Sequence, residues 1–176
     1  MSGNVLGYIA TRDLLIMNRV NGWRAPRWVR LWMIYATRGG DGWLWYALLL
    51  LVLLFGGEQR WVAIASSVVA SASGTALFLS LKRTFRRKRP CAIGPHVWAQ
   101  LLPPDQFSFP SGHTITAFAM SVSLGCFYPA MAPVLAFCAL SIAISRIVLG
   151  MHFLSDVVAG AAIGTTLGYV GVCLLS

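Results

Sequence analysis

The chain has 176 residues, of which 57% are hydrophobic and only 11% are charged. An average soluble domain needs about 25% charged residues, so this composition excludes a soluble globular domain, a disordered chain and a disulfide scaffold. Lysine and arginine total 14 against 5 acidic residues, a net charge of +9 that predicts an anionic partner. Nucleic acid is a poor candidate, because a chain dissolved in the bilayer has no soluble domain left to read it. An anionic lipid surface or a phosphorylated substrate fits better.

The first 41 residues are predicted to lie on the membrane surface. Residues 1–20 contain no continuous apolar stretch, because Arg12 and Asp13 interrupt it, so we do not expect a secretory signal there. Their apolar spacing favours an amphipathic surface helix, and residues 23–38 alternate aromatic side chains with arginines, as interfacial segments do. Residues 1–41 would therefore form an interfacial segment and residues 42–176 a transmembrane bundle, together one domain over 1–176.

Five apolar runs follow, at residues 43–55, 61–81, 114–128, 131–149 and 153–175. They predict an all-α fold, a multi-span transmembrane helix bundle with about five spans, of which the first is short for a bilayer about 30 Å thick. Gly160, Gly164 and Gly168 recur every four residues in the last run, a pattern that lets a neighbouring helix approach closely. Prolines exclude a continuous helix across residues 82–112, which form the one loop long enough to build a site.

Arg146, His152 and Asp156 cluster around the connection between the last two runs. Ionisable side chains within a membrane protein are costly to bury and usually serve a function. His152 and Asp156 are four residues apart, so they share one helix face, where the carboxylate can accept the ring N–H and leave the other nitrogen free to attack. A structural hydrogen bond is the more common reason for an isolated pair of this kind, and the neighbouring arginine favours the catalytic interpretation.

The segment Pro110-Ser111-Gly112-His113 comes directly before the third run. Ser111 is a natural N-cap for the helix, and Gly112 removes a side chain where the backbone would approach a ligand. The first free N–H groups of that helix would form a cradle for an anion. Taken alone, such a tetrapeptide is more often an ordinary helix cap.

Six of the eight residues from 82 to 89 are cationic. Such a run is more often a solvated flank that holds anionic lipid, whereas a functional interpretation would use one or two of its cations to bind phosphate. Helices that cross the membrane alternately would bring this run, the tetrapeptide and the histidine cluster to the same membrane face. This agreement of topology favours a shared site.

These residues resemble the three signature motifs of a known family. Lys82-x6-Arg89-Pro90, Pro110-Ser111-Gly112-His113 and Ser145-Arg146-x5-His152-x3-Asp156 are similar to those of the type 2 phosphatidic acid phosphatases, the PAP2 superfamily. That superfamily includes bacterial membrane lipid phosphatases and vanadium haloperoxidases, and the apolar runs exclude a soluble haloperoxidase.

The resemblance implies a role for each matching residue. His152 would be the nucleophile that forms a phosphohistidine, Asp156 would orient its ring, and His113 would be the general acid. The phosphoryl oxygens would be bound by Lys82, Arg89, Ser111, Gly112 and Arg146. The other cations of the basic run are assigned to the lipid-facing flank: Arg83, Arg86, Arg87 and Lys88.

No cofactor is expected. The residues that could in principle hold zinc are His96, His113, His152 and Asp156. No pair of them has a usual zinc spacing, and the adjacent cations would repel a metal ion. The family resemblance likewise implies a reaction without metal.

The sequence therefore predicts an integral membrane phosphatase that removes a terminal phosphate from a lipid phosphate or diphosphate. Phosphatidic acid, phosphatidylglycerol phosphate and undecaprenyl diphosphate are the candidate substrates, and the bilayer itself is the other partner. A lipid phosphotransferase with the same intermediate is one alternative. A non-catalytic phospholipid binder or transporter is another, although it would need neither His113 nor His152.

Orientation is predicted by two conflicting signals. Arginines concentrate in residues 1–41, on the same side as the basic run, and the positive-inside rule would place that side in the cytoplasm. The family resemblance implies instead a site that faces the periplasm or exterior. We adopt the resemblance and expect a protein of the bacterial cytoplasmic membrane whose active site faces the periplasm or exterior.

Overall fold

The computed structural model describes residues 3–93 and 105–176. The helices are α1 (Gly3–Asn21), α2 (Arg27–Gly39), α3 (Trp43–Phe55), α4 (Arg60–Phe85), α5 (Pro90–Ile93), α6 (Gly112–Phe127), α7 (Ala132–Val148) and α8 (Leu154–Leu175). Short 3-10 turns at Gly57–Gln59 and Pro129–Met131 precede α4 and α7. Within the described residues there is no strand, and Lys88 and Phe107 form an isolated antiparallel bridge. The all-α prediction is confirmed.

Each of the five apolar runs forms a helix at the predicted place. Among the described residues, three segments are long and apolar enough to cross a membrane: Gly57–Phe85, Pro129–Val148 and Leu154–Leu175. Helices α2 and α3 make a fourth only if they count as one span, because they are bent by 61° at their break. The helix predicted over 114–128 is α6, whose 16 residues span about 24 Å at 1.5 Å per residue and are short for a crossing. Length and hydropathy thus give three or four spans where about five were expected.

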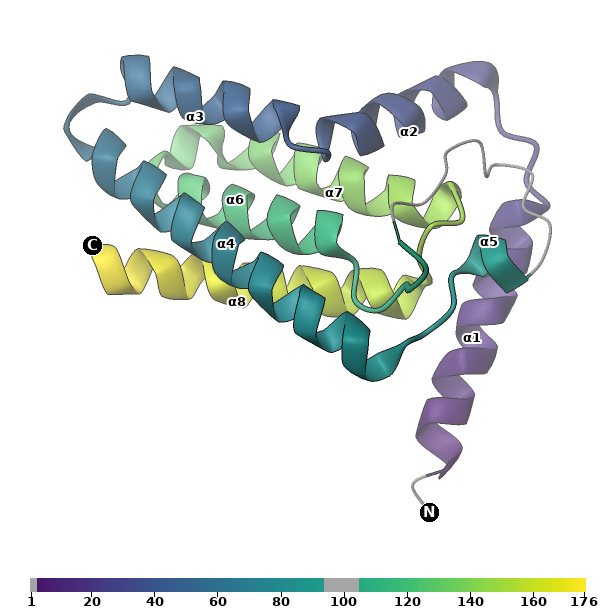
Figure 1. Cartoon of the computed structure of the whole chain (residues 1–176). Coiled ribbons are helices and arrows are strands. Elements are labelled where there is room, and N and C mark those ends of the chain that lie inside the picture. Colours follow the sequence, from purple (N-terminus) through teal and green to yellow (C-terminus); the bar gives the residue numbers. More distant parts are fainter. Residues whose placement is uncertain (1–2, 94–104) are drawn as a thin grey trace.

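Helix α6 lies at the centre of the bundle, between α4, α7 and α8 (Figure 1). Its close packing against α8 depends on the glycine stripe of α8, which consists of Gly160, Gly164 and Gly168. A Cβ at Gly160 would lie 2.9 Å from the Ser111 carbonyl oxygen, and one at Gly168 would lie 2.7 Å from that of Ala119. The stripe therefore lets the two backbones approach closely, as its spacing predicted.

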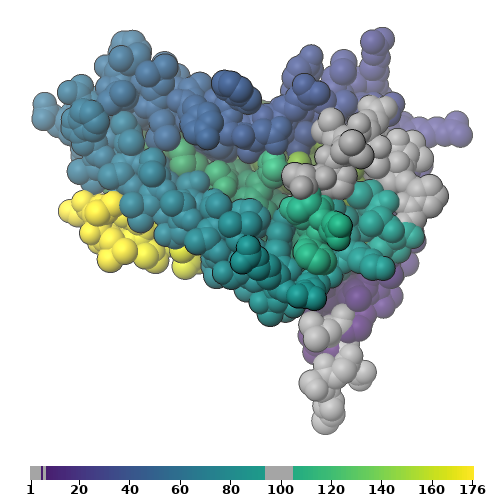
Figure 2. Space-filling view, viewed as in Figure 1, coloured from purple at the N-terminus to yellow at the C-terminus, as the bar shows by residue number. Residues whose placement is uncertain are grey.

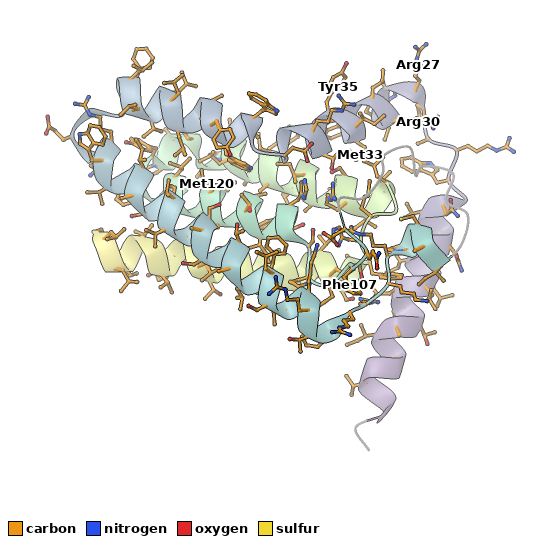
Figure 3. All side chains as sticks on the ribbon, in the orientation of Figure 1. Arg27, Arg30, Met33, Tyr35, Phe107 and Met120 are labelled. Carbon is orange, nitrogen blue, oxygen red and sulfur yellow. The ribbon has the colours of Figure 1, made fainter. Side chains whose placement is uncertain are left out.

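Helices α2 and α3 cover α7 and α6 from outside, and in the space-filling view they and α4 hide most of the centre of the bundle (Figure 2). Helix α2 is amphipathic: Val29 and Met33 are buried beside the end of α7, whereas Tyr35 is 70% exposed. Arg27 and Tyr35 project away from the bundle in Figure 3, where Met33 points toward α7. Residues 23–38, predicted to be interfacial, thus include a helix that packs on the outside of the bundle against α7.

Helix α1 extends away from the other helices at the opposite end from the C-terminus (Figure 1). Among its described side chains Asp13 is buried, at 3% exposure, and the others are exposed or half-buried. Helix α1 therefore meets the bundle around one acidic residue.

The connection after α4 begins later than expected. The helix continues through Lys82 to Phe85 and ends at Arg86, whose φ of 47° is left-handed. Lys82 thus belongs to the last turn of a helix and not to a loop. The prolines at 95, 103 and 104, part of the argument for a loop, lie outside the described residues.

Candidate active site

A cavity of about 300 Å³ lies at the end of the bundle where α4 ends and α6 begins. Its walls are Gly40, Asp41, Phe78, Lys82, Arg89, Asp105, Gly112, His113, Thr116, Arg146 and His152. The α2–α3 bend, the last turns of α4, the start of α6, the end of α7 and the α7–α8 connection each supply part of the wall. The three motifs that are far apart in the chain therefore converge, as predicted.

Lys82 and Arg89 meet one carboxylate in this cavity. Arg89 Nη2 donates to Asp105 Oδ1 at 2.9 Å, and Lys82 Nζ donates to Asp105 Oδ2. Burial alone would raise the pKa of Asp105, but the hydrogen bond from Lys82 and the charge of Arg89 outweigh it, so this pKa lies below its ordinary value. The Asp105 side chain is 37% exposed, so it faces the open side of the cavity.

Arg146 is the third cation of the cavity and is only 3% exposed. Its Nη1 donates to the Thr37 hydroxyl, and its Nε is buried with no hydrogen-bond partner among the described residues. No carboxylate of the described chain lies within ion-pair distance of this guanidinium. A buried guanidinium in this state is a ready site for an anion.

His152 is buried at the inner end of the cavity, at 2% exposure. Its Nε2 lies 3.1 Å from Nη1 of Arg89, which also donates to the Met151 carbonyl oxygen at 2.8 Å. Burial and the positive charges of Arg146 and Arg89 lower the pKa of His152 to about 3, although the Asp156 carboxylate opposes this. The imidazole is therefore neutral at physiological pH.

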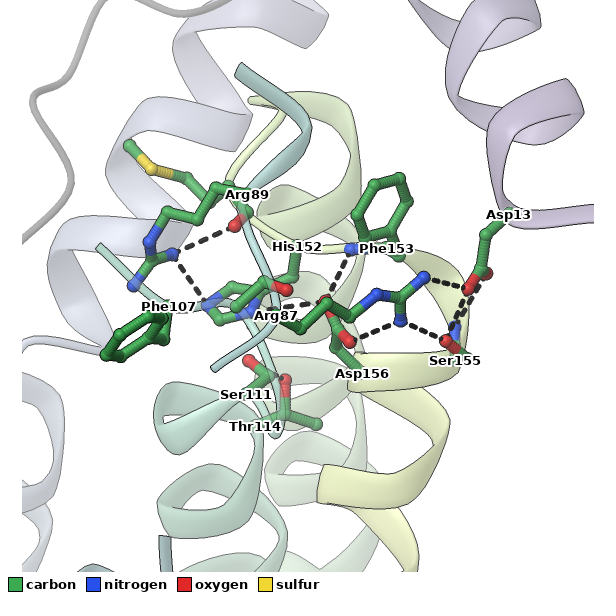
Figure 4. A network of polar contacts seen from close by, with 12 residues as sticks. Asp13, Arg87, Arg89, Phe107, Ser111, Thr114, His152, Phe153, Ser155 and Asp156 are labelled. Atoms are coloured by element: carbon green, nitrogen blue, oxygen red, sulfur yellow. Dashed lines mark hydrogen bonds and ion pairs between the residues drawn. The ribbon is translucent and has the colours of Figure 1, made fainter. Parts of the chain in front are cut away.

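The expected hydrogen bond between His152 and Asp156 is not formed. The two atoms that would make it, Nδ1 and Oδ2, are 3.8 Å apart, beyond hydrogen-bond range. Oδ2 instead accepts the backbone N–H of Phe153 at 2.8 Å, and Oδ1 accepts from Arg87 Nη1 at 2.7 Å. The carboxylate faces the ring as predicted, but other donors hold it (Figure 4).

His113 contacts an acidic residue that the sequence did not single out. Its Nε2 lies 2.7 Å from Oδ1 of Asp41, in the α2–α3 bend. The bend thus places a carboxylate beside the imidazole, on the open side of the cavity where the Asp41 side chain is 54% exposed.

Ser111 does not line the cavity. It occupies the N-cap position of α6, as predicted, but its side chain makes no capping hydrogen bond. It is fully buried, its hydroxyl accepts from Thr114 at 2.9 Å, and its N–H donates to the Asp156 carbonyl oxygen at 3.2 Å. Gly112 and His113, at the start of the helix, reach the cavity instead.

The assignment of Arg87 to the lipid-facing flank is wrong. Arg87 points inward and pairs with both Asp156 and Asp13 at 2.7 Å. The chain has only five acidic residues, and four of them contact cations or histidines in or behind the cavity. The scarcity of acids in so basic a chain was the signal that could have revealed Asp13, Asp41 and Asp105.

No group of three or more His, Cys, Asp or Glu side chains within residues 3–93 and 105–176 could hold a metal ion. His96, one of the residues considered for zinc, lies outside the described residues. The cavity is lined by cationic groups, which suit an anionic ligand.

The protein is thus an all-helical bundle with a cavity at the end of its helices, and Lys82, Arg89 and Arg146 line that cavity. A family model described as the PAP2 superfamily matches residues 60–176, well over half of the chain. The chain belongs to the PAP2 superfamily, and its long apolar helices make it an integral membrane protein.

Relatives in this superfamily carry names of phosphatases. Decaprenylphosphoryl-5-phosphoribose phosphatase of Mycobacterium tuberculosis is 36% identical over 130 residues, which cover 73% of this chain and 69% of that protein. Lipid A 1-phosphatase of Porphyromonas gingivalis is 33% identical over 125 residues, but these cover only 26% of its length.

Two solved structures have the same fold. Aquifex aeolicus LpxE matches with a TM-score of 0.78 and 29% identity over 91% of this chain and 94% of that one. The PAP2-type phosphatidylglycerolphosphate phosphatase of Bacillus subtilis matches with a TM-score of 0.74 and 22% identity, over 95% and 86% of the two chains.

Proposed function

We propose that the protein is a lipid phosphate phosphatase that works through a phosphohistidine on His152. The observation that carries this proposal is the set of charged groups in the cavity. Three cations meet there around a neutral histidine, and Arg146 has no anionic partner among the described residues. A phosphoryl group would supply the missing anion. The names of the relatives support hydrolysis as the reaction.

In the proposed first step, Nε2 of His152 attacks phosphorus. The new P–N bond forms as the bond from phosphorus to the leaving oxygen breaks, and His113 gives that oxygen a proton. In the second step His113 takes a proton from water, whose oxygen displaces the imidazole and releases inorganic phosphate. Burial and the positive charge of Arg146 lower the pKa of His113 to about 4, and the hydrogen bond and negative charge of Asp41 oppose this shift, toward the imidazolium form that the first step requires.

Lys82, Arg89 and Arg146 would stabilise the charge on the transferred phosphoryl oxygens, together with the first N–H groups of α6 at Gly112 and His113. Ser111 would contribute through its place at the N-terminus of that helix, since its hydroxyl is hydrogen-bonded to Thr114. The substrate phosphoryl group would replace the Asp105 carboxylate on Lys82 and Arg89. The proposed reaction uses no metal.

The substrate class we propose is a terminal phosphate on a long membrane lipid. The relatives are named for a decaprenyl-linked phosphoribose and for lipid A, which share this chemistry. Phosphatidic acid, phosphatidylglycerol phosphate and undecaprenyl diphosphate present the same group. We place the protein in the bacterial cytoplasmic membrane with its site toward the periplasm. Single cysteines introduced at positions 41 and 57, labelled from either side of the membrane, would test this orientation.

The test is release of inorganic phosphate from a panel of these lipids by the purified protein in mixed micelles. We expect release without an added acceptor and in the presence of chelator, and its loss in His152→Ala. Release that required an acceptor lipid would favour the phosphotransferase alternative. Lipid binding without release, unchanged in His152→Ala, would favour the binder, and loss of activity in chelator would contradict the mechanism without metal.

A further inference from the structure

Arg87 joins three side chains behind the cavity, outside the matched motif positions (Figure 4). Its Nη1 donates to Asp156 Oδ1 and to Ser155 Oγ, both at 2.7 Å, and its Nη2 donates to Asp13 Oδ2 at 2.7 Å. The guanidinium carbon also lies 4.1 Å from the centre of the Phe153 ring. A planar fork with a ring beneath it has little freedom to rotate.

Asp13 brings helix α1 into this network. Its Oδ1 accepts the backbone N–H of Ser155 at 3.0 Å, and its Oδ2 also accepts the Ser155 hydroxyl. Ser155 lies in the first turn of α8, next to Asp156. The buried acid of the N-terminal helix thus holds the start of the helix that carries the carboxylate facing His152.

The network determines how Asp156 lies. This residue is fully buried: Arg87 donates to its Oδ1, and the Phe153 N–H donates to its Oδ2, the oxygen that faces the His152 ring. A buried carboxylate without a cationic partner is strongly unfavourable, and Arg87 is the cation that pairs with Asp156, at 2.7 Å from Oδ1. Neither Lys82 nor Arg89 takes this role, because both are paired with Asp105 in the cavity.

The net charge of this network also favours the proposed reaction. Asp13, Arg87 and Asp156 together carry one net negative charge, behind a neutral imidazole. Attack by Nε2 on phosphorus makes that imidazole positive, and a fixed negative charge near Nδ1 stabilises the developing charge. The 3.8 Å gap between Nδ1 and Asp156 Oδ2 would close only if the carboxylate remained oriented toward the ring.

We infer that Arg87 and Asp13 are positioning residues of this phosphatase: they act through Asp156 to hold the negative charge behind the His152 ring during formation of the phosphohistidine. The inference rests on the proposed function. It assigns the N-terminal helix a part in the chemical step, through a contact made by one acidic side chain.

The test compares Arg87→Met, Arg87→Lys and Asp13→Asn with Arg83→Met, a matched control. Arg83 belongs to the same basic run, and its side chain is exposed. For each protein in mixed micelles, kcat and KM for a lipid phosphate, the inhibition constant of inorganic phosphate and the melting temperature are measured. Phosphate inhibition reports on the cavity cations, which this network does not touch.

We expect kcat to fall about 100-fold in Arg87→Met and about 10-fold in Arg87→Lys and Asp13→Asn, as misplacement of a catalytic group does. KM and the phosphate inhibition constant should stay within about 2-fold, and Arg83→Met should match wild type. Lysine retains the charge but lacks the fork, so its partial rescue separates charge from geometry.

Wild-type kcat in Arg87→Met and Asp13→Asn would overturn the inference. A parallel loss of kcat, phosphate binding and melting temperature would also overturn it, because it would show a structural role only. If Arg87→Met does not fold, the near-isosteric variant Asp13→Asn tests the inference instead, by the same measurements of kcat, phosphate inhibition and melting temperature. Activity retained in His152→Ala would refute the proposed function itself, whereas an inactive His152→Ala with a fully active Arg87→Met would refute this inference alone.

Discussion

Nη1 of Arg89 lies 3.1 Å from Nε2 of His152, and the contact determines which ring nitrogen carries the proton. A guanidinium can only donate, so Nε2 accepts and the proton of the neutral ring resides on Nδ1, which faces Asp156. The nitrogen that contacts Arg89 is therefore the unprotonated one, whose electron pair accepts this hydrogen bond. The same arginine that would bind the phosphoryl group thus orients the atom proposed to attack it.

A buried neutral His152 makes the stability of the protein depend on pH. The unfolded chain protonates this residue near pH 6.5, whereas the folded protein does so only near the lowered pKa of about 3. The contribution of His152 to the free energy of unfolding is therefore fully present above pH 6.5. It falls as the pH drops toward 3, by about 5 kcal/mol in total at 1.36 kcal/mol per pKa unit. Between pH 7.5 and 4.5, the melting temperature of wild type should fall more steeply than that of His152→Gln. Parallel curves for the two proteins would contradict the prediction.

Asp41 should matter most for substrates with poor leaving groups. Asp41→Asn removes the carboxylate that contacts His113, so the proposed general acid should lose about 10-fold in kcat on an alkyl lipid phosphate. An aryl phosphate with a good leaving group needs little protonation and should be hydrolysed at nearly the wild-type rate. Glu58→Gln is the matched control, because Glu58 is exposed and absent from the cavity wall. An equal loss on both substrates would exclude a role through the leaving group.

Asp105 occupies the cations that a substrate phosphoryl group would bind. Removal of its charge in Asp105→Asn should free Lys82 and Arg89, and inorganic phosphate should then inhibit about 5-fold more strongly, about 1 kcal/mol of binding. The inhibition constant measured at several pH values above 5 checks this, since the lowered pKa of Asp105 keeps it ionised throughout that range. Weaker phosphate inhibition in the variant would mean that Asp105 holds the two cations in place for the ligand.

The glycine stripe of α8 predicts a loss of stability on adding a single methyl group. A Cβ at Gly164 would overlap the Ile115 carbonyl oxygen and lie 2.9 Å from Cβ of Phe118, so Gly164→Ala must push α8 away from α6. We expect a loss of about 1–3 kcal/mol, the usual cost of overpacking, seen as a lower melting temperature. Gly7→Ala is the control, since nothing lies within 4 Å of a Cβ there. Equal melting temperatures would show that the helices can separate without cost.

The helices could be predicted from the sequence because the signal for them is local. Runs of apolar residues and the prolines that end them depend on neighbours in the chain, and each predicted run is a helix. The meeting of the three motifs at one cavity could be predicted for a related reason. Arg146, His152 and Asp156 are close in sequence, and alternating helices bring the other two motifs to the same end of the bundle.

The partners of these residues could not be predicted in the same way. Asp13 meets Arg87 across 74 positions, and Asp41 meets His113 across 72. From the sequence, Arg87 is assigned to the lipid-facing flank, because nothing in a run with six cations distinguishes one arginine from the next. In the structure α4 ends at Arg86, which is left-handed, and the next side chain, Arg87, forms ion pairs with Asp13 and Asp156.

By itself, the sequence determined an all-helical membrane protein with three motifs of cations and histidines, which we propose bind phosphate, since composition and motif spacing are properties of the chain. The tertiary structure decided which carboxylate meets which base, where α1 and α2 contact the site, and that Asp156 is held by Arg87 instead of by His152. The reason is physical: ion pairs between distant segments depend on how helices pack and bend relative to one another, and no local pattern encodes that arrangement.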